Sequence, residues 1–149
     1  KLAFTVGPDG AVQSVHLKEA DLGAWEVESC LLEIARGIEF ARPKGGNGVA
    51  EFEIDLTFQA KRATLAWDED TVDKEVQKKL KDLAACTPAP EEAWVTFYAG
   101  TRGQVTSAGF AGAKPIDPAW AECASAAIAK WTVSDPRGQV AKGSFRYSP

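Results

Sequence analysis

Few side chains of this 149-residue chain have the types and spacing needed for acid–base or nucleophilic chemistry. His16 is the only histidine, and because it falls in a strand-like stretch, a structural role is favoured over catalysis. Ser14 and Ser107 lie outside the glycine-flanked turn that exposes a nucleophilic serine. With no catalytic set to assemble, the sequence predicts a protein that is not an enzyme and that uses no cofactor.

An acidic run and a glycine-rich run could each suggest ligand chemistry. The acidic residues are Asp68, Glu69, Asp70 and Asp73, and they lack the glycine and the spacing of a calcium loop. Acidic groups also suit the first turn of a helix, where the helix dipole is positive, so we interpret the run as a solvated helix start and predict no metal site. The run Gly45–Gly48 does not open a helix after a strand and is interpreted as a turn, not a phosphate loop.

The three cysteines, Cys30, Cys86 and Cys123, are the remaining reactive side chains. Cys86 and Cys123 each fall on the apolar face of an expected helix, which favours a disulfide between them. Three buried free thiols are the alternative. No C-x-x-C pair and no histidine cluster supports zinc. The disulfide would leave Cys30 unpaired, since its expected partner would lie upstream of Lys1.

The elements that position these residues occur twice. A shift by 93 positions, the interval from Gly10 to Gly103, aligns matching residues without a gap as far as Gly45: Phe4 with Phe97, Cys30 with Cys123, and Pro43 with Pro136. A self-match at a fixed interval indicates two copies of one supersecondary unit. We place the first unit at residues 1–62 and the second at 63–149. Units of this size are marginally stable when isolated.

Each unit is expected to run strand, strand, helix, strand. In the first, strands are predicted at Leu2–Gly7, Val12–Leu17 and Glu51–Gln59, with a helix over Trp25–Ile38. In the second, the helix begins at Asp117-Pro118 and the last strand spans Gln139–Tyr147. Both hairpins show the same slip in apolar alternation, which suggests a bulge or a strong local twist.

Apolar residues at helical spacing predict the buried helix faces. On the first helix they are Val27, Cys30, Leu31, Ile34 and Ile38. The second unit has an additional leading helix, at about 71–86, with a face made of Val72, Val76, Leu80, Leu83 and Cys86. The matching face of its main helix consists of Trp120, Cys123, Ala127, Ile128 and Trp131.

Composition excludes several classes of protein. The chain is 45% hydrophobic and 26% charged, which is typical of soluble globular proteins. A net charge of −4 without a basic stripe argues against nucleic-acid binding. The chain has no run of apolar residues long enough for a membrane span, so we expect no insertion of this segment. It begins without a methionine or a signal-like segment, and we expect it to be a piece of a longer protein.

The segments F-T-V-G-P-D-G-A-V-Q-S-V-H-L and F-A-R-P-K-G-G flank the cysteine-bearing helix and precede an alternating strand. This order resembles the periplasmic C-terminal domain of TonB-type energy transducers. It is most similar to the form found in gliding and social motility envelope proteins of the AgmX/PglI type. The second unit departs at residues 132–138, where the aromatic residue and the second glycine are missing.

The resemblance implies an α+β fold of two tandem modules, each a three-stranded antiparallel sheet with a helix packed on one face. It also implies a periplasmic location, which a disulfide would fit. The implied function is non-catalytic: protein interaction or force transmission in an envelope-spanning machine. The implied partner is another envelope protein, in the outer membrane or the periplasm. A passive periplasmic scaffold, and a secreted inhibitor or binding domain, are the alternatives.

In TonB-type domains, the last strand of the unit accepts an extended segment of the partner as an added strand. Carried over, this predicts two binding edges, made of Glu51, Phe52, Glu53, Ile54, Asp55 and Leu56 in the first unit and of Lys142, Ser144 and Arg146 in the second. One edge is acidic and the other is basic, so the two strands either pair with each other or serve different partners. We expect at least one edge to remain open.

Overall fold

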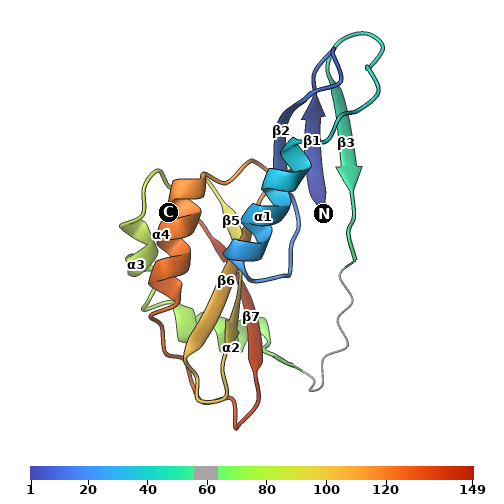
Figure 1. Cartoon of the computed structure of the whole chain (residues 1–149). Helices are drawn as coiled ribbons and strands as arrows, with labels where there is room; N and C mark the ends of the chain where they lie inside the picture. Colours follow the sequence, from blue (N-terminus) through green and yellow to red (C-terminus); the bar gives the residue numbers. More distant parts are fainter. Residues whose placement is uncertain (56–63) are drawn as a thin grey trace.

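The computed structural model of the chain describes residues 1–55 and 64–149 and has an α+β architecture with two sheets (Figure 1). The first sheet is antiparallel and has the order β2-β1-β3, with β1 at Leu2–Val6, β2 at Val12–Leu17 and β3 at Gly48–Phe52. The second has the order β4-β7-β5-β6, with β4 at Leu65–Ala66, β5 at Ala93–Ala99, β6 at Val105–Ala111 and β7 at Ala141–Tyr147. The helices are α1 (Trp25–Arg36), α2 (Glu69–Val76), α3 (Lys81–Ala84) and α4 (Pro118–Ile128).

The order strand, strand, helix, strand occurs twice, as β1-β2-α1-β3 and as β5-β6-α4-β7. In both copies the first strand pairs with the other two. Each hairpin contains a register shift at the same place, between Thr5 and Val6 and between Tyr98 and Ala99. The bulge predicted from the shared slip in alternation is therefore confirmed. A short parallel strand, β4, pairs with β7 and was not predicted.

Gly10 and Gly103 occupy equivalent hairpin turns with φ of +92° and +83°. The carbonyl of Gly10 accepts a hydrogen bond from the N–H of Phe40 at 2.9 Å, and that of Gly103 accepts one from Val133 at 2.8 Å. A Cβ at these glycines would lie only 2.3 Å and 2.2 Å from the carbonyl oxygens of Phe40 and Val133. Both the backbone conformation and the close approach therefore require glycine.

The second unit has the larger core. Trp120 of α4 is fully buried, stacks on Tyr147 with ring centroids 5.5 Å apart, and meets the edge of Phe110 at 5.1 Å. The predicted disulfide between Cys86 and Cys123 is present and ties the end of the leading segment to α4.

The leading segment forms two short helices where the sequence predicted one helix over about 71–86. The break lets α2 pack against β7 while α3 packs against α4. Val72, Val76, Leu83 and Cys86 are nevertheless all buried. The apolar pattern therefore identified the correct residues, although two helices divide them.

The predicted buried face of α1 is wrong. Cys30, Val27, Ile34 and Ile38 are exposed, and the helix ends at Arg36. The face that is buried consists of Trp25, Glu28, Leu32 and Ala35. The physical reason is that α1 packs against β6 and α4 of the second unit as well as against β2 of its own.

The two units meet where β2 ends and β6 ends. The N–H of Gly112, the residue after β6, donates to the carbonyl of Leu17, the last residue of β2, at 2.9 Å. The ring of Trp25 lies 6.1 Å from that of Phe110, which adds an apolar contact between α1 and β6. The segment between β2 and α1 therefore lies against the second unit, and the cleft described below opens there.

Candidate partner-binding edges

β3 is an outer strand whose backbone groups point alternately toward β1 and away from the sheet. The N–H of Lys18 donates to the carbonyl of Lys1 at 2.9 Å, so odd-numbered residues of β1 direct their backbone groups to β2 and even-numbered residues direct theirs to β3. Because Ala50 lies opposite Phe4, its N–H and C=O groups point toward β1. Those of Val49 and Glu51 therefore point outward, away from the sheet. In the described ranges no strand pairs with this outer edge.

Apolar side chains accompany this open edge. The side chain of Val49 is 87% exposed, and those of Phe52 and Ile54 are about half exposed. Phe52 is anchored on its inner side, because its ring lies 5.6 Å from that of Phe4 and 5.9 Å from that of Phe40. Open apolar edges invite pairing with another chain unless they are protected.

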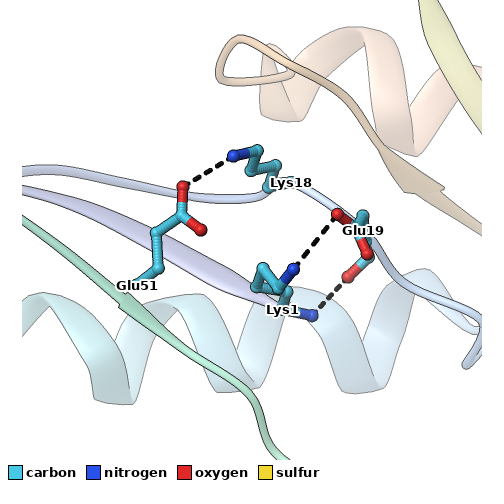
Figure 2. A network of polar contacts seen from close by, with 4 residues as sticks. All are labelled: Lys1, Lys18, Glu19 and Glu51. Atoms are coloured by element: carbon cyan, nitrogen blue, oxygen red, sulfur yellow. Dashed lines mark hydrogen bonds and ion pairs between the residues drawn. The ribbon is translucent and has the colours of Figure 1, made fainter.

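Glu51 is the charged residue on the edge, and its carboxylate is already engaged (Figure 2). The Lys18 ammonium lies 2.6 Å from Glu51 Oε1 and holds the pKa of that carboxyl below its usual value. Nearby, the Lys1 ammonium lies 3.3 Å from a Glu19 oxygen, and the amino group of Lys1 bonds the Glu19 carbonyl. The acidic character predicted for this strand is therefore partly neutralised by neighbouring lysines.

A cleft of about 740 Å³ lies beyond the end of β3, lined by residues of the first unit and by Trp94 of the second. Apolar side chains form part of its wall, and charged groups that include Lys18 and Asp21 form much of the remainder. The apolar lining residues are Leu2, Leu17, Ala20, Leu22, Leu31, Ile54 and Trp94. The cleft therefore places apolar surface directly beyond the end of β3.

The edge of β7 differs from that of β3. β4 covers its first two residues, with Leu65 opposite Ala141 and Ala66 opposite Lys142. By alternation from Lys142, the backbone groups of Ser144 and Arg146 also point away from β5. In the described residues no strand pairs with them.

The side chains predicted for the second edge are all engaged within the chain. The ammonium of Lys142 lies 2.9 Å from Asp21, the hydroxyl of Ser144 lies 2.9 Å from that of Thr96, and Arg146 lies 3.5 Å from a Glu92 oxygen. These residues therefore contact β5, the residue just before it, and the segment between β2 and α1.

The two edges predicted from the sequence do not pair with each other, because β3 pairs with β1 while β7 pairs with β5 and β4. The first edge also begins earlier than predicted. β3 spans Gly48–Phe52, whereas Glu53, Ile54 and Asp55 follow it without strand structure. Leu56 and the rest of the predicted strand lie outside the described residues.

Glu28 was not identified from the sequence. It is 1% exposed, and its Oε2 accepts a hydrogen bond at 2.7 Å from the backbone N–H of Phe110 on the outer side of β6. Burial raises the pKa of this carboxyl to about 7, and the bond from Phe110 opposes that rise. Its burial could have been predicted from the sequence, since Glu28 lies at helical spacing between the apolar residues Trp25, Leu32 and Ala35.

In the described ranges no group of three or more metal-ligating side chains gathers, and no helix is long and apolar enough to cross a bilayer.

His16 lies on β2, opposite Ala3, and burial lowers its pKa. It borders a smaller cavity of about 310 Å³ between α1 and the start of α4.

Comparisons of the chain with protein-family models, with curated proteins and with solved structures found no match.

Proposed function

We propose that this protein is a non-catalytic interaction module that binds an extended segment of another envelope protein as a strand added to β3. The observation that supports this most is the outward direction of the Val49 and Glu51 backbones on a strand without a second neighbour in the described residues. An added strand would satisfy those groups with main-chain hydrogen bonds, while pockets for its alternate side chains would give specificity.

The surroundings of β3 favour a partner segment with apolar residues. Exposed apolar surface follows the edge at Val49, Phe52 and Ile54. The cleft beyond β3 extends this apolar surface from Ile54 to Trp94. The neutralisation of Glu51 by Lys18 lowers the cost of placing another backbone beside it. The first unit is therefore the preferred binding unit, since the corresponding part of β7 begins under β4.

We place the protein in the periplasm, as two tandem modules of the TonB C-terminal type that transmit force or assemble an envelope complex. The disulfide between Cys86 and Cys123 supports an oxidising compartment. The repeated order of elements and the matching bulges support the tandem arrangement. A role in a gliding-motility or TonB-like machine depends on the sequence resemblance.

Short random peptides displayed on phage and selected on the whole chain provide the test. We expect selected peptides to be extended and apolar, and to slow amide exchange at Val49 and Glu51 when bound. Val49→Pro removes an outward N–H without touching the bonds to β1, and should abolish binding. Val49→Thr retains the N–H and is the matched control, with melting temperatures measured for both variants.

A different outcome would favour the scaffold alternative. If selected peptides bind equally well to wild-type, Val49→Pro and Val49→Thr chains, strand addition at β3 is not the mode of recognition. A failure to select any peptide, combined with slow exchange at Val49 and Glu51 in the free protein, would indicate that the edge is already covered.

A further inference from the structure

A strip of apolar side chains on α1 lies at the surface. Val27 is 47% exposed, Ile34 is 66% exposed, and Ile38, just beyond the helix, is 41% exposed. Cys30 lies among them with a free and exposed thiol. We call these residues, with the partly buried Leu31, the α1 strip. Their spacing places them on one face of the helix.

In the second unit two of the equivalent residues are buried, although Cys123 is exposed. At the interval of the repeat, Val27 corresponds to Trp120 and Ile38 to Trp131, which are 0% and 4% exposed. Figure 1 shows α3 beside α4, whereas no helix in the described part of the chain lies in the corresponding place beside α1. Asp82 of α3 accepts a hydrogen bond from the indole of Trp131 at 3.1 Å. The counterpart of Cys30 is Cys123, which is bonded to Cys86 after α3.

The sheets show the same contrast. Phe145 of β7 is 5% exposed, and its counterpart Phe52 of β3 is 47% exposed. α2 packs against β7, and no described helix occupies the matching position on β3. Trp131, which bonds Asp82 of α3, and Phe145 of β7, against which α2 packs, are therefore buried beside the leading helices, while their counterparts Ile38 and Phe52 are exposed.

We propose that the α1 strip is the docking face for a cysteine-bearing helix of the same polypeptide, placed ahead of Lys1 as α3 is placed ahead of β5, and that Cys30 forms a disulfide with it. Cys86 lies eight residues before Trp94, which is the counterpart of Lys1, so the partner cysteine is expected about eight residues ahead of Lys1. The expected pattern around it is that of Leu80, Leu83 and Cys86, with apolar residues three and six positions before the cysteine.

Forming this bond oxidises two thiols. Two protons and two electrons leave them, and a protein or small-molecule disulfide takes up the electrons by thiol–disulfide exchange and becomes a dithiol. The same class of oxidant is needed for the bond between Cys86 and Cys123. This proposal does not depend on strand addition at β3, so the two can fail separately.

The test uses the chain extended by its natural residues ahead of Lys1 and produced in an oxidising compartment. Digestion without reduction, followed by mass spectrometry, should give a peptide in which Cys30 is linked to a cysteine upstream. An upstream sequence without such a cysteine, a free Cys30 thiol in the extended chain, or a dimer linked through two copies of Cys30 would each overturn the proposal.

A second measurement reports on docking without the disulfide. Ile34→Asp should lower the melting temperature of the extended chain by about 3 °C or more, because it places a charge under the docked helix. The same variant should leave the melting temperature of the chain that begins at Lys1 nearly unchanged, since Ile34 is solvent-exposed there. Glu33→Asp, at an exposed position next to it, is the control. Equal shifts from Ile34→Asp in the two chains would show that nothing docks on the strip.

Discussion

Glu28 makes the stability of this protein depend on pH near neutrality. The carboxyl is 1% exposed, and in the described residues no cation forms an ion pair with it, so its neutral form is favoured in the folded chain. Its pKa rises from 4.5 to about 7. A raised carboxyl pKa means that the folded state binds the proton more tightly than the unfolded state. The contribution of Glu28 is therefore fully present below pH 4.5 and is lost as the pH rises through about 7.

The expected magnitude follows from the two pKa values of Glu28. One pKa unit corresponds to about 1.4 kcal/mol, so ionisation of this buried carboxyl costs roughly 3 kcal/mol in total. Between pH 5 and pH 8 the free energy of unfolding should fall by roughly 2 to 3 kcal/mol on this account. Carboxyls with lowered pKa, such as that of Glu51, act in the opposite direction but below about pH 4.5.

Urea denaturation of wild-type and Glu28→Gln chains at pH 5, 6, 7 and 8 measures this effect. The variant can still accept the N–H of Phe110 but does not ionise, so its stability should exceed that of the wild type by a margin that grows toward pH 8. Burial lowers the pKa of His16, and because both chains contain this residue, the difference between them cancels its contribution. Glu26→Gln, at an exposed position of the same helix, is the control. Parallel pH profiles for wild type and Glu28→Gln would refute the reasoning.

Three further predictions concern stability. Reduction of the Cys86–Cys123 disulfide, which spans 37 positions, should lower the free energy of unfolding by up to about 4 kcal/mol, and thiol titration of the unfolded, unreduced chain should find one thiol. Gly103→Val should destabilise the chain by more than the roughly 1 kcal/mol of a typical substitution, and an unchanged melting temperature would contradict the turn geometry. Asp21→Asn breaks the bond to Lys142, but its side chain is largely exposed, so urea titration should show a loss of less than about 1 kcal/mol that high salt removes.

The repeat and the hairpins could be predicted from the sequence because local rules determine them. Gly10 and Gly103 mark turns that no residue with a side chain would tolerate, and the same bulge follows from the same alternation in both copies. The disulfide could be predicted for a similar reason, since the helical spacing of Leu83 and Cys86 brings the end of the leading segment onto α4, where Cys123 lies.

The face of α1 and the bounds of β3 could not be predicted in the same way. Helical periodicity identifies apolar faces, but α1 has two of them, one with Val27 and Ile34 and one with Trp25 and Leu32. The contact of α1 with β6 determines that the face with Trp25 and Leu32 is buried. Similarly, the apolar alternation continues from Phe52 to Ile54, but Phe52 lies opposite Leu2, the first residue of β1, so β3 has no partner on β1 beyond Phe52. Both outcomes depend on neighbours distant in sequence.

The junction between the units gives the two copies different roles. In the second unit, Lys142 bonds Asp21, which belongs to the segment that leads from β2 into α1, so the face of β7 helps to hold the first unit in place. Glu28 joins α1 to the outer side of β6 in the same region. Both contacts join the second unit to the first. The outer side of β3 makes no contact with the second unit in the described residues. If only one copy binds a partner by strand addition, it should therefore be the first, with the second as its support.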